Sequence, residues 1–171
     1  MTIRVLDAGD AAAYQRLRLL ALQDSPTAFS ASYEEEVGRS LDDVAARIAP
    51  APDGSIRMLG AFHGQALAGF VALIHPQRAK LRHGAEIAGM FVAPAQRRRG
   101  LGRALLGAAI DQARALDGVR QLKLGVNATN TAARVLYESA GFLPYGLEPD
   151  ALYVGGQFFG QAHYLLRLNQ A

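Results

Sequence analysis

A cluster of cationic and small residues between positions 97 and 103 is the feature of this sequence that most clearly indicates chemistry. Its members are Arg97, Arg98, Arg99, Gly100, Gly102 and Arg103. The first turn of a helix presents backbone N–H groups without intrahelical partners and a partial positive charge, so it binds phosphates well. Glycines at such a position let an anion approach the amides closely. The spacing favours an anion site over the alternative, a solvated cationic loop.

Two familiar phosphate-binding motifs do not fit this stretch. A P-loop requires Lys followed by Ser or Thr directly after its last glycine, and Arg103-Ala104 follows Gly102 here. A dinucleotide fingerprint requires a third glycine where Leu105 stands. The anion site therefore belongs to another class of phosphate-containing ligand.

The elements that would position this cluster follow from the hydrophobic periodicity and the turn signals. We expect helices from near Asp10 and over residues 41–48, 100–116 and 131–140, with Ser40 and Asn130 as N-caps. We expect strands over residues 3–6, 56–62, 66–74, 85–92, 121–126, 151–154 and 158–168. This order predicts an α/β (α+β) fold, with one mixed, mostly antiparallel sheet flanked by helices and a central strand–helix–strand–helix unit.

Length and composition narrow the class further. The 171 residues are 50% hydrophobic, which suits a single domain over residues 1–171. The chain has no cysteine, and its four histidines lack ligand spacing, so no metal site is expected. The net charge of +3 and the lack of aromatic residues among the arginines argue against nucleic acid as a partner. No signal peptide or membrane span is expected, since the longest apolar run is far shorter than ~20 residues, and we expect a cytoplasmic protein.

Two motifs together resemble the GNAT superfamily of N-acetyltransferases. Arg97-x-x-Gly100-x-Gly102 is similar to the superfamily's Q/R-x-x-G-x-G/A signature, and residues 87–94 resemble its fourth strand. Asn130 to Phe142 resembles the second signature, N-x-x-A-x-x-L-Y-E-x-x-G-F. A looser similarity includes residues 17–29, so the resemblance extends over most of the chain.

The resemblance implies that the chain binds acetyl-CoA as its cosubstrate and transfers the acetyl group to an amine. Backbone amides at residues 97–102 would hold the pyrophosphate, and the backbone of residues 90–92 would pair with the pantetheine arm. The residues expected to bind the cosubstrate are Met90, Phe91, Val92, Arg97, Arg98, Arg99, Gly100, Leu101, Gly102, Arg103, Asn130, Ala133 and Tyr137. Tyr137 would also act as a general acid toward the CoA thiolate, although its helical stripe suits a core position too.

The general base is harder to assign. Some relatives carry a glutamate in an L-E-V triplet on the fifth strand, whereas this chain has Leu124-Gly125-Val126. Glu86 is our candidate, because alternation along a strand would place it on one face with Ala88 and Met90. The alternatives are an ordinary solvated glutamate at a strand end, or a titrating role for His75 or His83.

The expected acceptor is an amine-bearing small molecule or peptide. Acidic residues in the first helices, among them Glu34, Glu35 and Glu36, would favour a cationic amine if they face the pocket. The alternative function is a catalytically silent CoA-binding module, which the missing glutamate at position 125 keeps open. Self-association is common in the family, so a homodimer is also considered.

Overall fold

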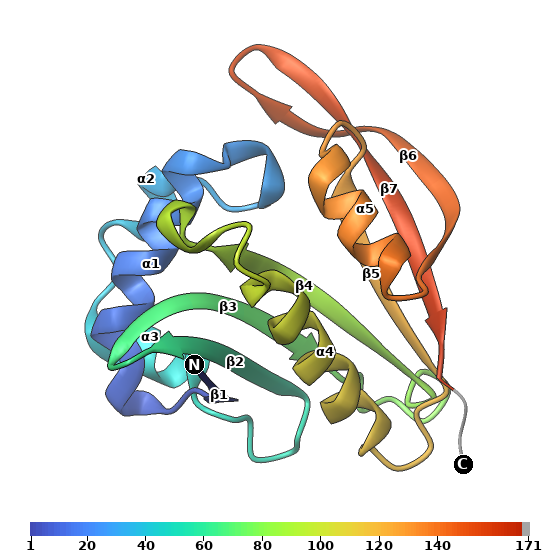
Figure 1. Ribbon diagram of the computed structural model, residues 1–171, viewed down its shortest axis with the longest axis horizontal. Helices are drawn as coiled ribbons and strands as arrows, with labels where there is room; N and C mark the ends of the chain where they lie inside the picture. The colour runs from blue at the N-terminus through green and yellow to red at the C-terminus, as the bar shows by residue number, and fades with distance from the viewer. Residues whose placement is uncertain (169–171) are drawn as a thin grey trace.

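The computed structural model describes residues 1–168, in which seven strands form one sheet in the order β1-β2-β3-β4-β5-β7-β6. Only β4 and β5 run parallel, and every other neighbouring pair is antiparallel (Figure 1). The strands are β1 (Thr2–Val5), β2 (Ile56–His63), β3 (Ala66–Ile74), β4 (Gly84–Val92), β5 (Gln121–Asn127), β6 (Leu143–Val154) and β7 (Gln157–Arg167). The predicted fold class is confirmed.

Five α-helices and three short 3₁₀ segments connect the strands. They are η1 (Ala8–Asp10), α1 (Ala11–Asp24), η2 (Pro26–Ala28), α2 (Tyr33–Glu36), α3 (Leu41–Ile48), η3 (Pro94–Gln96), α4 (Leu101–Arg114) and α5 (Thr131–Ser139). The Ser40 and Asn130 side chains accept hydrogen bonds from the amides of Asp43 and Ala133, so both predicted N-caps are confirmed. The sequence analysis missed α2, which spans a single turn.

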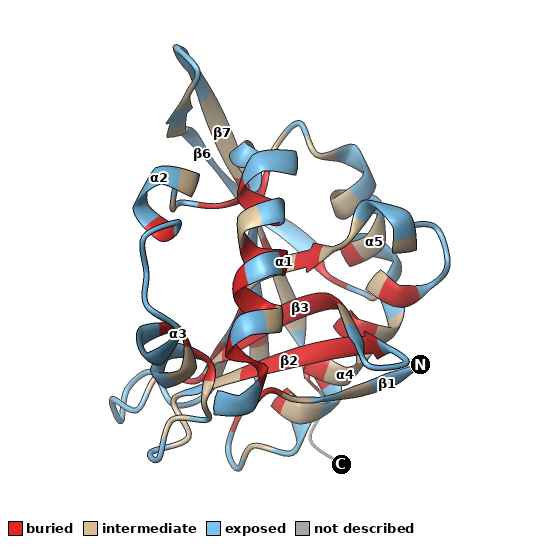
Figure 2. Cartoon of the chain, turned by 90° about the vertical axis from the view of Figure 1, so that its left-hand side faces the viewer, coloured by how far each residue is buried: buried red, intermediate tan, exposed pale blue. Residues whose placement is uncertain are grey.

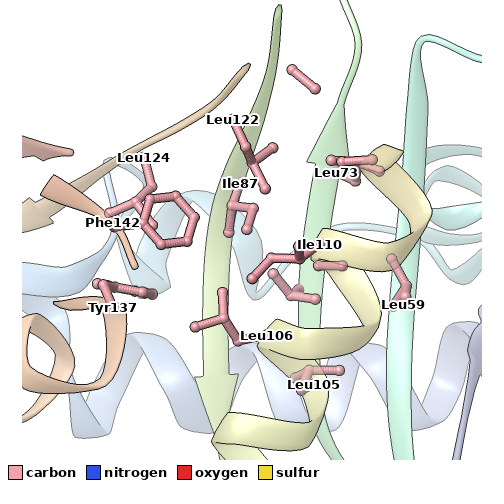
Figure 3. Packing of buried hydrophobic residues seen from close by; sticks show 14 of the residues in the cluster. Leu59, Leu73, Ile87, Leu105, Leu106, Ile110, Leu122, Leu124, Tyr137 and Phe142 are labelled. Atoms are coloured by element: carbon pink, nitrogen blue, oxygen red, sulfur yellow. The ribbon is translucent and has the colours of Figure 1, made fainter. Parts of the chain in front are cut away.

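The helices cover both faces of the sheet. One face packs against α1 and α3 through a cluster that includes Tyr14, Ile48 and Phe70. The other face packs against α4 and α5 (Figure 3). In Figure 3, Leu106 and Ile110 of α4 point toward Ile87 of β4. Strands β2, β3 and β4 contribute side chains to both clusters, so they are packed on both faces of the sheet.

The last hairpin differs from the expectation. The sequence predicted a strand only over 151–154, but β6 begins at Leu143 and contains Pro144, Gly146 and Pro149. A proline lacks a backbone N–H, and an edge strand tolerates it when that side has no partner. β6 lies at the edge of the sheet, so its prolines are compatible with a strand that sequence signals alone would have broken. The tip of the hairpin extends away from the core and is largely exposed (Figure 2).

Candidate active site

The site begins where β4 and β5 separate. The two strands pair from Gly84 with Gln121 through Ile87 with Leu124, and no further pair joins them within residues 1–168. Gly89 has φ +59°, and the β3–β4 register shifts between Phe70 and Ala72, so β4 contains a bulge here. Beyond the bulge the two strands diverge (Figure 1), which leaves the β4 edge without a sheet partner on the β5 side.

The bulge corrects one prediction about Glu86. Strict alternation would place Glu86, Ala88 and Met90 on one face, but the extra residue at Gly89 reverses the pattern. Ala88 packs with the α1 and α3 cluster, whereas Met90 packs with the α4 and α5 cluster. Glu86 and Ala88 line a cavity on the α1 side of the sheet, and Met90 lines a groove beside α5.

This groove lies between the end of β4 and the starts of α4 and α5, with a volume of about 510 Å³. The predicted cosubstrate residues that line it are Met90, Phe91, Val92, Arg97, Arg98, Gly102, Asn130, Ala133 and Tyr137. Four other predicted residues do not line it: Arg99, Gly100, Leu101 and Arg103. Leu101 is instead a buried core residue, and Arg103 lies beside a shallow depression between α4 and α5.

The start of α4 has the backbone geometry that the glycines suggested. Gly100 is the N-cap and has φ +81°, a conformation that side chains strongly disfavour. A Cβ on Gly102 would contact Leu136 and Met90 at 3.5 and 3.6 Å, so any side chain there would occupy space at the groove wall. Gly102 lines the groove, and it belongs to the first helical turn, whose amides have no intrahelical partner.

The two arginines that line the groove, Arg97 and Arg98, differ in whether they pair with other residues of the protein. Arg97 donates through Nε to the Val92 carbonyl oxygen at 3.0 Å and forms an ion pair with Asp24 at the end of α1. The hydrogen bond from Arg97 lowers the pKa of the Asp24 carboxyl. Arg98, which also lines the groove, is in none of the ion pairs formed by residues 1–168. Arg98 is thus available to an anionic ligand, whereas Arg97 holds β4 against α1.

Tyr137 lies at the inner end of the groove. Its side chain packs edge-on against Phe142, with ring centroids 6.1 Å apart, and its hydroxyl is 3.9 Å from the Met90 sulfur. Burial raises the pKa of Tyr137 to about 12, so the phenol is protonated at any physiological pH. Tyr137 is therefore both a buried core residue and part of the groove lining, whereas its helical spacing in the sequence was compatible with either role.

A narrow throat connects the groove with the cavity on the other side of the strands. Ala28, Met90, Asn130, Ala133 and Tyr137 are shared by groove and throat. Ala28, Ile87, Ala88, Gly89, Gly125 and Asn127 are shared by throat and cavity. The cavity has a volume of about 420 Å³. One continuous passage thus runs from the start of α4, through the gap between β4 and β5, to the space under α1.

With this geometry established, the chain can be compared with known proteins. The model of the acetyltransferase (GNAT) family matches residues 17–142, which is most of the chain. The chain belongs to the GNAT family. Membership confirms the expectation of an acetyltransferase with acetyl-CoA as the acyl donor, and the groove provides residues that suit such a ligand.

Solved GNAT structures share the whole fold. An acetyltransferase of the GNAT family from Streptococcus pneumoniae superposes with a TM-score of 0.85 at 25% identity, over 98% of this chain and 99% of that one. A phosphinothricin acetyltransferase from Sinorhizobium meliloti, in complex with acetyl-CoA, gives 0.84 at 22% identity, over 99% and 89%. A ribosomal-protein-alanine N-acetyltransferase from Brucella melitensis gives 0.84 at 21%, over 98% and 100%. No curated protein matches the sequence.

The expectation that acidic residues of the first helices face a pocket is confirmed for Glu34, which lines a pocket of about 510 Å³ between α2 and the β6–β7 hairpin. The acidic residues of the first helices do not line the cavity. Glu36 is buried and accepts hydrogen bonds from Arg39 and Arg47, and Glu35 caps α2 through the Ser32 amide. The charged side chains that do line the cavity are Arg18, Arg47 and Glu86.

Two lining residues that the sequence analysis missed define the cavity. Arg18 is buried on α1, and Gln161 extends from β7 over Gly125, where a Cβ would meet the Gln161 Nε2 at 1.8 Å. The space of the missing glutamate side chain is therefore filled from the neighbouring strand. Arg18 was visible only as part of the family resemblance, and Gln161 had no sequence signal.

The histidines flanking the β3–β4 loop lie outside this passage. His75 is buried, and its Nε2 lies 2.9 Å from the Arg82 carbonyl oxygen, so it fixes the loop that precedes β4. His83 is exposed, and neither side chain lines the groove, the throat or the cavity. A structural role accounts for His75. Within residues 1–168, no group of side chains has the arrangement of a metal site.

Proposed function

We propose that this GNAT protein transfers the acetyl group of acetyl-CoA directly to a primary amine of a small molecule or peptide. The observation that carries the proposal is the continuous passage in which groove and cavity meet at a throat beside Tyr137. A donor in the groove and an acceptor in the cavity would approach each other there without leaving the protein. Such positioning is a large part of what accelerates a reaction between two substrates.

The groove residues would bind and orient the cosubstrate. The amides at the start of α4 and the Arg98 side chain suit the pyrophosphate, and the unpaired β4 edge at residues 90–92 suits a main-chain pairing with the pantetheine arm. Asn130 uses its side-chain oxygen to cap α5 and lines the groove as well. Bound acetyl-CoA supplies a thioester whose C–S bond breaks as the amine nitrogen forms a C–N bond.

Tyr137 would act as the general acid at the departing sulfur. Its phenol is protonated, and among residues 1–168 the only partner of its hydroxyl is the weak acceptor sulfur of Met90. Because the pKa of about 12 lies above that of an ordinary thiol, ~8.5, full proton transfer to the sulfur is uphill. We therefore propose that Tyr137 stabilises the developing thiolate chiefly by donating a hydrogen bond, a contribution typically worth ~10²–10³-fold in rate.

Glu86 would remove the proton from the substrate ammonium. It lines the cavity on the same side as Ala88, but it is not part of the throat itself. A water molecule between Glu86 and the amine would therefore relay the proton. Replacing Glu86 with Gln is expected to lower kcat/KM most strongly at low pH, where unassisted deprotonation of the amine is least favourable.

The direct test is thiol release from acetyl-CoA against a panel of primary amines, preceded by thermal unfolding with and without acetyl-CoA. A ligand at ~100 times its Kd raises the unfolding free energy by about 2.7 kcal/mol, a clear shift in Tm. Thiol release with an amine, together with the N-acetylated product, is the expected result. A Tm shift without release from any amine would favour the silent CoA-binding module instead.

We propose that two copies associate through the β6–β7 hairpin. Its apolar side chains Leu143, Tyr145, Leu147, Tyr153 and Phe158 are each more than half exposed, and β6 is an edge strand. Such a surface is unusual for a monomer. Sedimentation velocity should give a dimer for the native chain and a monomer for Leu147→Lys; a native monomer would refute this.

No helix within residues 1–168 is long and apolar enough to cross a membrane. A cytoplasmic location stays a prediction.

A further inference from the structure

Arg18 is a buried guanidinium that faces the acceptor cavity. It lies on α1, its residue is 6% exposed, and it lines the cavity together with Phe29. Its guanidinium carbon lies 4.6 Å from the centroid of the Phe29 ring. The Nε atom is buried and has no hydrogen-bond partner. A buried polar group without a partner is costly, and a charged one more so.

Within residues 1–168, no acidic side chain forms an ion pair with Arg18. Glu36, the buried carboxylate of the same corner, accepts hydrogen bonds from Arg39 at 2.9 Å and from Arg47 at 2.8 Å. Burial lowers the pKa of Arg18, and the nearby Arg47 acts in the same direction, whereas Tyr14 and Glu36 raise it. An arginine remains charged at neutral pH. The cavity therefore retains an unpaired positive charge.

The charged side chains of the cavity suit a ligand that carries both a positively and a negatively charged group. Arg18 and Arg47 supply positive charge, and Glu86 is the one acidic side chain within residues 1–168 that lines the cavity. A guanidinium binds a carboxylate through two parallel hydrogen bonds, which a planar fork of donors favours. The cavity volume of about 420 Å³ lies within the range of small-molecule pockets.

We propose that the acceptor is an amino-acid-like molecule, a primary amine that also carries a carboxylate, and that Arg18 binds this carboxylate. The inference rests on the proposed acetyl transfer and names its substrate class. The carboxylate lies against Arg18 and Phe29, and the amine is directed toward the throat. Tyr137 lines the throat, and Glu86 lines the cavity next to it. Arg18 is thus a specificity-determining residue.

The test compares matched acceptors. Thiol release is measured for free amino acids, their carboxamides and the corresponding decarboxylated amines, with the native protein, Arg18→Gln and Arg18→Met. Methionine keeps an unbranched stem that can pack on Phe29 but removes the charge. We expect the native kcat/KM to favour the acid over the amide by about 30-fold or more, which corresponds to ~2 kcal/mol. Both variants should reduce this ratio to near one.

Arg16→Gln is the matched control, because Arg16 lies exposed on the same helix and does not line the cavity. It should keep the native ratio. All four proteins should show the same Tm shift with acetyl-CoA, which demonstrates that folding and the groove are intact. Native protein that uses amides and decarboxylated amines as well as acids would overturn the proposal, as would an unchanged ratio in both Arg18 variants.

A binding measurement separates this proposal from the proposed catalysis. Calorimetric titration of CoA-loaded protein with the amino acids and their amides needs no turnover. Preferential binding of the acids that is lost in Arg18→Gln, without thiol release, would support the acceptor class and refute the catalytic proposal. Equal binding of acids and amides would refute the acceptor class even if thiol release occurs.

Discussion

The close approach of Gln161 to Gly125 predicts a measurable coupling between the two positions. A Cβ built on Gly125 would lie 1.8 Å from the Gln161 Nε2 and 2.7 Å from its Cδ, distances that no pair of atoms tolerates. Gly125 does not have a positive φ, so its backbone would accept alanine without strain. Gly125→Ala must therefore displace the Gln161 side chain.

Two opposing contributions set the magnitude. Alanine in place of glycine within a strand contributes about 0.5–1 kcal/mol of stability. Forcing Gln161 out of its rotamer costs about 0.5–1.5 kcal/mol. Gly125→Ala alone should therefore change the unfolding free energy by between about +0.5 and −1 kcal/mol. The same change should add about 0.5–1 kcal/mol of stability once Gln161→Ala has emptied the space.

The assay is thermal and urea unfolding of the four proteins of the double-mutant cycle, without ligand. A coupling of about 1 kcal/mol corresponds to a difference of about 2–4 °C in Tm for a chain of this size. If Gly125→Ala shifts Tm by the same amount in both backgrounds, Gln161 does not occupy the space over Gly125, and our account of the missing glutamate is wrong.

Three further predictions follow from other parts of the structure. Tyr137→Phe should lower kcat about 10²–10³-fold while keeping the acetyl-CoA Tm shift. The pKa of Tyr137 is about 12 in the folded protein and ~10 in the unfolded chain, so Tyr137 contributes stability below pH 10 that is lost as the pH rises toward 12. Between pH 10 and 12, Tyr137→Phe should therefore unfold less readily than the native chain. Burial alone would raise the pKa of Glu36, but Arg47 and Arg39 hold this pKa below its ordinary value. Glu36 therefore contributes stability at pH values above its pKa in the unfolded chain, and this stability is lost as the pH falls through its pKa in the folded protein. Glu36→Gln should cost about 1–3 kcal/mol in urea unfolding at pH 7, discounted because both arginines are partly exposed, and the difference should vanish in acid. Gly100→Ala should cost about 1–2 kcal/mol at φ +81° and reduce the acetyl-CoA Tm shift, whereas an unchanged shift would refute a role for the α4 amides.

The sequence predicted those parts of the structure that local signals determine. The capping residue Asn130 was correctly located because capping chemistry is local. The first part of β6 was missed because Pro144 and Pro149 break strand patterns unless the strand is at an edge, a property of the whole sheet. The bulge at Gly89 had a signal that we did not use, a glycine inside a strand.

The sequence predicted the lining of the groove better than the lining of the cavity. The groove residues form contiguous motifs, so their types and spacing carried information. The acceptor cavity combines residues from distant segments, such as Arg18 of α1 and Gln161 of β7. Whether an arginine forms an ion pair depends on which acidic residues the fold places beside it. Glu36 forms its ion pairs with Arg39 and Arg47, not with Arg18. No periodicity in the sequence contains that information.

The short ladder between β4 and β5 has a consequence for how the molecule opens. Within residues 1–168, strand pairing joins β1–β4 to β5–β7 only through the four residue pairs from Gly84–Gln121 to Ile87–Leu124, so the sheet has a seam at its centre. Amides of β5 to β7 are therefore expected to exchange with solvent through a sub-global opening that leaves β1 to β4 protected. A ligand that pairs with β4 and contacts α5 would close this seam. The availability of acetyl-CoA would then set how long the C-terminal half resists proteolysis, and it would link the lifetime of the protein to the supply of its own cosubstrate.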